Sequence, residues 1–184
     1  GASSSAMVTA SSFLLAILSL VEVRSTYHAE SQLNVNGGAL QKCDRSKVND
    51  PRYPTTGYMR PVPELENRCT AVEHDAGSHY VCVNLPSAES KDGRLYSPFW
   101  TKTGQASSAE EASSWPLPGP WCICMWAFAR MYEMHPEFIN DLECSATNHW
   151  TIEQYDVNVK NQRDALKAIC DKCAIENPKC NSVS

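Results

Sequence analysis

Nine cysteines in a chain of 184 residues are the feature that most restricts how this sequence can fold. Cytosolic proteins keep their thiols reduced and rarely carry so many, so this density indicates either an oxidising compartment or metal binding. In an oxidising compartment eight of the nine can pair, and each bridge would stabilise the fold by roughly 2–4 kcal/mol. The sequence does not give the connectivity. The disulfide candidates are Cys43, Cys69, Cys82, Cys122, Cys124, Cys144, Cys170, Cys173 and Cys180.

Cys122 and Cys124 lie one residue apart in the stretch PWCICM. In a strand they would point to the same face, but in an extended chain they are too close to bridge each other comfortably. We therefore expect each of them to be bridged elsewhere or buried in the core. The last four cysteines are the natural set to clamp the C-terminal helix and the tail that follows it.

The N-terminal segment is strongly apolar, because residues 6–21 carry no charged side chain. At the helical rise this run covers roughly 24 Å, a little less than a bilayer core of ~30 Å, and a helix extended over Ser3 to Val23 closes that gap. We interpret residues 1–24 as one transmembrane anchor and residues 25–32 as a linker. The alternative is a signal peptide that begins at Met7 and is cleaved near Ser25, which would leave a secreted soluble domain.

Residues 33–184 predict a small α+β domain with short strands, long loops and a C-terminal helix. The segment Tyr80–Leu85 is the clearest strand, and residues 161–173 place their apolar side chains on one helical face. Residues 121–134 predict a strand that turns into a helix, and residues 147–156 predict a further strand. The Ser-rich and Gly-rich segment 102–114 has the composition of an exposed insertion.

Five segments occur in order that together suggest a family: NVNGGALQKC (34–43), TGYMR (56–60), GSHYVC (77–82), LYSP (95–98) and LPGPWCIC (117–124). They resemble a mostly bacterial family catalogued as domain-of-unknown-function family 2237, over residues 33 to about 173. The resemblance implies a small soluble α+β domain without an assigned activity. Its characteristic positions fall on Cys43, Arg60, Cys69, Ser78, His79, Cys82, Trp121, Cys122 and Cys124. The four C-terminal cysteines look like additions to the family pattern.

Three kinds of chemistry are open to these residues. A zinc site would take its soft ligands from His79, Cys82, Cys122 and Cys124, although only the C-terminal Cys170 and Cys173 show the tight spacing of structural zinc pairs. That pair also has the C-x-x-C form of redox proteins, but it lies near a helix C-terminus, which disfavours a thiolate. Ser78, His79 and Asp75 supply the residue types of a triad, yet neighbours in a strand face opposite ways. No motif indicates another cofactor.

The hypothesis that follows is a non-catalytic, membrane-anchored accessory subunit of a larger organellar membrane complex. A photosystem with the domain in the thylakoid lumen comes first, and a respiratory complex facing the mitochondrial intermembrane space second. The expected partners are membrane lipid and other subunits, contacted through the anchor, the insertion 102–114 and the exposed aromatic candidates Trp100 and Trp115. A net charge of −5 argues against nucleic acid. The alternatives are a thiol-redox or metal-binding enzyme and a secreted disulfide-rich domain.

Overall fold

The computed structural model describes residues 33–56, 67–69 and 77–183, which belong to the compact unit Ser31–Ser184. The predicted anchor and linker lie outside these residues. Within the described ranges, no helix is both long enough and apolar enough to cross a bilayer. The prediction of a small mixed domain with short strands and helices is confirmed.

A two-stranded antiparallel ladder lies at the centre of the described domain. Strand β1 (Val81–Leu85) pairs with β4 (Gly119–Ile123), and Val83 is opposite Trp121. Four of the five β1 side chains are buried, and only Asn84 is exposed. A short apolar run of this kind is what a strand covered on both faces requires. The strand predicted at Tyr80–Leu85 is therefore confirmed, apart from its first residue.

Helices α4 (Met125–Met134) and α6 (Lys160–Cys173) pack against each other and supply nine residues of the main core. Helix α4 starts directly after Cys124 and ends before Pro136, whose ring cannot continue a helix. The predicted change from strand to helix within 121–134 and the predicted last helix are both confirmed. The buried side chains of these two helices are Met125, Phe128, Ala129, Met131, Ala165, Leu166, Ala168, Ile169, Cys170 and Cys173.

Short helical turns connect these two helices. The 3₁₀ turns η2 (Pro136–Asp141) and η3 (Cys144–Ala146) lead into α5 (Trp150–Gln154), and α7 (Pro178–Ser182) follows α6 near the C-terminus. The strand predicted within residues 147–156 is therefore wrong. The side-chain oxygen of Asn148 accepts a hydrogen bond from the Trp150 backbone N–H at 2.9 Å, and this local contact favours a helix start over an extended chain.

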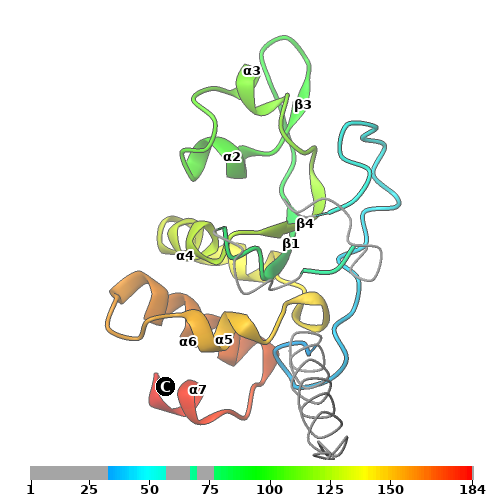
Figure 1. Cartoon of the computed structure of the whole chain (residues 1–184). Coiled ribbons are helices and arrows are strands. Elements are labelled where there is room, and N and C mark those ends of the chain that lie inside the picture. Colours follow the sequence, from blue (N-terminus) through cyan, green and yellow to red (C-terminus); the bar gives the residue numbers. More distant parts are fainter. Residues whose placement is uncertain (1–32, 57–66, 70–76, 184) are drawn as a thin grey trace, which may run out of the picture. The chain divides into compact units, whose positions relative to one another are not determined.

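The segment between the two central strands forms a small subassembly of its own. Strands β2 (Ala88–Glu89) and β3 (Leu95–Tyr96) pair, and α2 (Pro98–Lys102) packs against α3 (Ala109–Ala112). In Figure 1, α2, α3 and β3 lie at one end of this domain and α5, α6 and α7 at the other, with β1 and β4 between them. Within the predicted insertion 102–114, Ala106 and Ala112 are buried in the core, while seven of the thirteen residues are exposed.

Gly119 occupies the first position of β4 for two physical reasons. Its φ is +116°, and a Cβ built there would lie 2.7 Å from Cγ2 of Val48. Gly93 also has a positive φ, of +78°, but a Cβ there meets no atom within 4 Å. We expect Gly119→Ala to lower the free energy of unfolding by about 1–3 kcal/mol, and Gly93→Ala by less. Urea unfolding with the disulfides intact measures both variants, and equal losses would show that the Val48 contact costs nothing.

Candidate functional site

The site is built around two cysteines that are opposite each other on the central strands. Cys82 of β1 is in register with Cys122 of β4. The backbone N–H of Cys82 donates to Oγ1 of Thr147 and its carbonyl oxygen accepts from the N–H of Glu143, so both groups point away from β4. Cys82 and Cys122 therefore form a non-hydrogen-bonded pair, the arrangement that brings opposite side chains closest together.

Each of these two cysteines is bonded to a loop rather than to the other. The disulfides are Cys43–Cys82 and Cys69–Cys122, and all four residues are at most 1% exposed. The Sγ atoms of Cys43, Cys69 and Cys82 lie within 4.8 Å of one another, so the two bonds are neighbours. The hydroxyl of Thr56 donates to Sγ of Cys122 at 2.8 Å. The two disulfides form a second, sulfur-rich core beside the ladder.

This arrangement bears on the predicted zinc ligands. Zinc binds the thiolate form of cysteine, whereas Cys82 and Cys122 are oxidised here. Among the described residues, the structure does not bring His79 and Cys124 together with them as one ligand group. The sulfur atoms that do come together belong to Cys43, Cys69 and Cys82, so a zinc site would require the reduced protein.

The four C-terminal cysteines form the other two disulfides, Cys144–Cys173 and Cys170–Cys180. They fasten the end of α6 to η3 and to α7. The prediction that this set clamps the last helix and the tail is confirmed. Cys170 and Cys173 are not bonded to each other, so the C-x-x-C motif does not form a redox pair in this structure.

Cys124 is the one cysteine of the nine that lies outside the disulfides. It is half-buried and is the N-cap residue of α4, directly after β4. The positive end of a helix dipole favours a thiolate, so this position suits a reactive thiol better than the end of α6 does. Nearby, the phenol of Tyr155 donates to the carbonyl oxygen of Met125 at 2.6 Å. Burial, and after it the charge at Cys124, raises the pKa of the Tyr155 phenol well above its usual value.

The Gly77–His79 turn is attached to the same end of α4. Ser78 has a φ of +48°, and its carbonyl oxygen accepts from the N–H of Met125 at 3.0 Å. The His79 ring folds back over Gly77, where a Cβ would lie 1.9 Å from Cε1 of the imidazole. A larger residue there would require the imidazole to move. Strained backbone of this kind clusters at functional sites, so the turn and Cys124 form one candidate site. The third residue of the predicted triad, Asp75, and the family position Arg60 lie outside the described residues.

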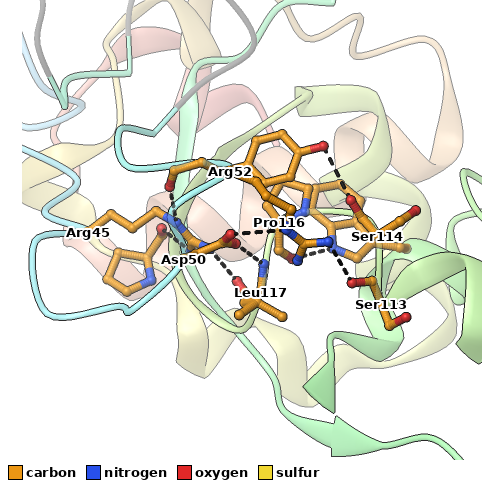
Figure 2. Close-up of polar contacts among 10 residues, drawn as sticks. Arg45, Asp50, Arg52, Ser113, Ser114, Pro116 and Leu117 are labelled. Carbon is orange, nitrogen blue, oxygen red and sulfur yellow. Dashed lines mark hydrogen bonds and ion pairs between the residues drawn. The ribbon is translucent and has the colours of Figure 1, made fainter. Parts of the chain in front are cut away.

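A buried ion pair ties the loop after Cys43 to the segment before β4. Both side chains of the Arg45–Asp50 pair are fully buried, and Nη2 of Arg45 lies 3.0 Å from Oδ2 of Asp50. The guanidinium also donates to three backbone carbonyl oxygens and covers the Trp121 ring at 5.0 Å. Figure 2 shows the Asp50 carboxylate between Arg45, Arg52 and the N–H of Leu117. The accepting carbonyls belong to Tyr53, Leu117 and Pro120.

The two predicted partner-binding tryptophans pack against each other near Pro116. Trp100 is 3% exposed and its indole N–H donates to the carbonyl oxygen of Pro116 at 2.9 Å, so its ring belongs to the core. Trp115 is half-buried, with its ring centroid 5.2 Å from that of Trp100. A role for Trp115 in partner binding stays a prediction. Sequence reasoning missed Arg45 and Asp50, because two isolated charged residues in a loop give no periodic or motif signal.

Comparison with known proteins adds no assignment. A scan with protein-family models found no match to this chain, and a search of curated proteins found none. The resemblance to domain-of-unknown-function family 2237 therefore stays a prediction. The site is interpreted from its own geometry.

The buried pair makes the fold depend on Asp50. Removing one partner of a buried ion pair leaves the other charge uncompensated, so we expect Asp50→Asn to lower the free energy of unfolding by about 3–5 kcal/mol at neutral pH. The matched control is Asp92→Asn, because Asp92 pairs with Arg94 at 2.6 Å on the surface. Exposed pairs contribute at most about 1 kcal/mol. Urea unfolding of both variants tests this, and similar losses would contradict a special role for the buried pair.

The Asp50 carboxylate should make the free energy of unfolding depend on pH. Burial alone would raise the pKa of Asp50, but hydrogen bonds from Leu117 and Arg45 and the charge of Arg52 outweigh it and hold the pKa below the ordinary value. A lowered pKa in the folded state stabilises the protein above the pKa of the unfolded chain, about 3.9, and this contribution is lost as pH falls through the lower folded value. The free energy of unfolding, measured from neutral to acid pH, should fall less steeply in Asp50→Asn than in the unchanged protein. An unchanged slope would mean that Asp50 does not titrate in this range.

Proposed function

We propose that this chain is a non-catalytic accessory domain that works in an oxidising compartment and docks on a partner protein. The single observation that carries the proposal is that eight of the nine cysteines are joined in four disulfides. Disulfides persist outside the reducing cytosol. The cysteines that zinc or redox chemistry would need are thereby committed to holding loops, a helix and the tail in place.

The exposed side chain that best suits docking is Trp126. It is 40% exposed on α4 and meets the buried Tyr155 ring edge-on, with 6.3 Å between the centroids. A ring already packed against a buried side chain loses little conformational freedom when a partner covers it. Tryptophan is also enriched among the residues that dominate the binding energy of interfaces. Met134, on the same helix, is also exposed. The outer surface of α4 is therefore the proposed docking surface.

The finer assignment concerns the membrane. We extend the proposal to a single-pass anchor in residues 1–24 and to an accessory subunit of an organellar membrane complex, a photosystem first and a respiratory complex second. Its support is the uncharged run of residues 6–21 together with the disulfides. A secreted domain, with residues 1–25 removed as a signal peptide, is the alternative that the same disulfides support.

A second candidate function is thiol chemistry at Cys124. The observation that favours it is the position of this thiol, outside the disulfides and at the N-terminus of the ten-residue helix α4. The positive end of the helix dipole favours the thiolate, which is the nucleophilic form of cysteine. The Gly77–His79 turn lies against the same helix end through the Ser78–Met125 hydrogen bond.

Thiol counting separates the disulfide-bonded domain from a metal or redox protein. We expect the native protein, denatured without reductant, to take up one iodoacetamide label at Cys124, and nine labels after reduction. Intact-mass spectrometry measures both counts. Several labels before reduction, or a mass increase from bound zinc under native conditions, would contradict the proposal.

Docking is tested by affinity capture from the native source with the full chain as bait. Trp126→Ala should abolish the capture of partners while leaving the protein folded, because the residue is 40% exposed and offers that surface to a partner. Leu95→Ala is the matched control, since Leu95 is 43% exposed on β3, which lies with α2 and α3 at one end of the domain and away from α4 (Figure 1). If Cys124→Ser abolishes a measured thiol-dependent activity and Trp126→Ala leaves capture unchanged, the second function replaces the first.

A further inference from the structure

Three sulfur atoms of the sulfur-rich core converge, and a fourth is bonded to one of them. The Sγ atoms of Cys43, Cys69 and Cys82 all lie within 4.8 Å of one another, and Sγ of Cys122 is bonded to Sγ of Cys69. Among the described residues, no other three histidine, cysteine or carboxylate side chains gather in this way, so the C-terminal disulfides form no such group. The four side chains are at most 1% exposed, and the core they form excludes bulk water.

The spacing of these atoms is close to that of a four-cysteine zinc site. Sulfur atoms placed tetrahedrally around zinc lie about 3.8 Å apart, because each Zn–S bond is about 2.3 Å long. Sγ of Cys69 is bonded to neither Cys43 nor Cys82, so its separation from their sulfur atoms exceeds this spacing by no more than about 1 Å. The bonded pairs can reach the same spacing once their bonds are broken, so small side-chain rotations place the sulfur atoms around one ion.

Contacts that do not involve sulfur hold the four residues in place. Two of them belong to the central ladder. The backbone N–H of Cys43 donates to the carbonyl oxygen of Asn67 at 2.6 Å, and the carbonyl oxygen of Cys69 accepts from Nδ2 of Asn148 at 3.1 Å. Reduction of the disulfides leaves these hydrogen bonds untouched, so the thiols that it produces stay together.

The sulfur atom of Cys122 has a hydrogen-bond donor that suits a thiolate. The hydroxyl of Thr56, a buried residue, donates to it at 2.8 Å. Uncharged cysteine sulfur is a weak acceptor, whereas hydrogen bonds to a charged acceptor are roughly twice as strong as neutral ones. Groups that bond to metal ligands orient them and tune the affinity for the metal. Thr56 is therefore in position to support Cys122 as a metal ligand.

We infer that the reduced protein binds one zinc ion in the sulfur-rich core. Its ligands are the thiolates of Cys43, Cys69, Cys82 and Cys122. Each disulfide first takes two electrons and two protons from a dithiol reductant, which itself becomes a disulfide. The four thiols then release their protons to solvent as their sulfur atoms bond to the ion. The same side chains thus close this core in two ways, as two disulfides or as one metal centre.

This property goes beyond the proposed function, because it belongs to the chain before its disulfides have formed or after they are reduced. In that state the ion holds the loops of Cys43 and Cys69 against the ladder, since the free energy of metal binding contributes to folding. Zinc binding by the reduced chain and docking of the oxidised domain are separate properties, so either can fail alone.

The test is a zinc titration of the full chain after reduction with a trialkylphosphine and its removal under argon. Native mass spectrometry should show one zinc per chain, and Co²⁺ in its place should give the absorption bands of tetrahedral thiolate coordination. Iodoacetamide should then leave the four ligands unlabelled. The cysteines expected to take the label are Cys124, Cys144, Cys170, Cys173 and Cys180.

A threonine pair tests the hydrogen bond to the ligand. Thr56→Val should weaken zinc binding by about 10–100-fold, as loss of a group that orients a metal ligand does. Thr103→Val is the matched control, because both threonines are 6% exposed but the hydroxyl of Thr103 donates to the carbonyl oxygen of Phe99. Its zinc affinity should equal that of the unchanged protein. Competition with a chromophoric zinc chelator measures both.

A cysteine pair tests the ligand set. Cys43→Ser with Cys82→Ser should abolish zinc binding, whereas Cys144→Ser with Cys173→Ser, which removes as many thiols from the C-terminal set, should retain it. If the first variant does not fold, the labelling pattern of the unchanged protein decides. Absence of bound zinc, protection of the C-terminal cysteines instead of the four ligands, or equal affinities in the two threonine variants would overturn the inference and leave the docking function untouched.

Discussion

The side-by-side placement of Cys82 and Cys122 on the central ladder is the constraint on which the rest of the structure depends. Their disulfides close segments of 39 and 53 residues against two strands that pair over only five residues each. A two-stranded ladder this short is marginal by itself, and cross-linking restricts the unfolded chain that competes with it. The loop that contains Cys43 then brings Arg45, two residues further on, to the face of Trp121 on β4. The buried position of the Arg45 guanidinium is a consequence of the Cys43–Cys82 disulfide.

The Arg45–Asp50 pair shows how this domain tolerates charge inside its core. Desolvating two ions is costly, and the cost is offset only where the remaining donors and acceptors are used. Here the guanidinium is shared among Asp50 and three carbonyl oxygens, and the carboxylate also accepts from the N–H of Leu117. The pair therefore specifies where the Pro-rich segment before β4 lies, since those carbonyls can be satisfied in one arrangement of the loop.

What could be predicted from the sequence was local. The strand at Tyr80–Leu85 and helix α6 follow from hydrophobic periodicity, and the use of cysteines in disulfides follows from their density. Three features depend on tertiary structure alone. They are the connectivity of the disulfides, the hydrogen bonds of Arg45 to carbonyl oxygens 72 and 75 residues away, and the hydrogen bond of Asn36 to Cys173 across 137 residues. The strand expected within 147–156 is wrong because α5 begins at Trp150, after a local turn in which the Asn148 side chain accepts a hydrogen bond from the Trp150 N–H. Trp100 was expected on the surface because its Ser-rich and Pro-rich surroundings resemble an exposed loop.

The two C-terminal disulfides have a consequence for how the protein responds to proteolysis. Cys180 is bonded back to Cys170, so residues 170–180 form a closed covalent ring rather than a tail with one attachment. A protease that cuts one peptide bond within this ring leaves both ends connected through sulfur. The C-terminal fragment stays attached to α6 through the Cys170–Cys180 disulfide, so the fold around it can remain largely assembled. Nicked and intact molecules would then differ in mass by one water while sharing one covalent framework.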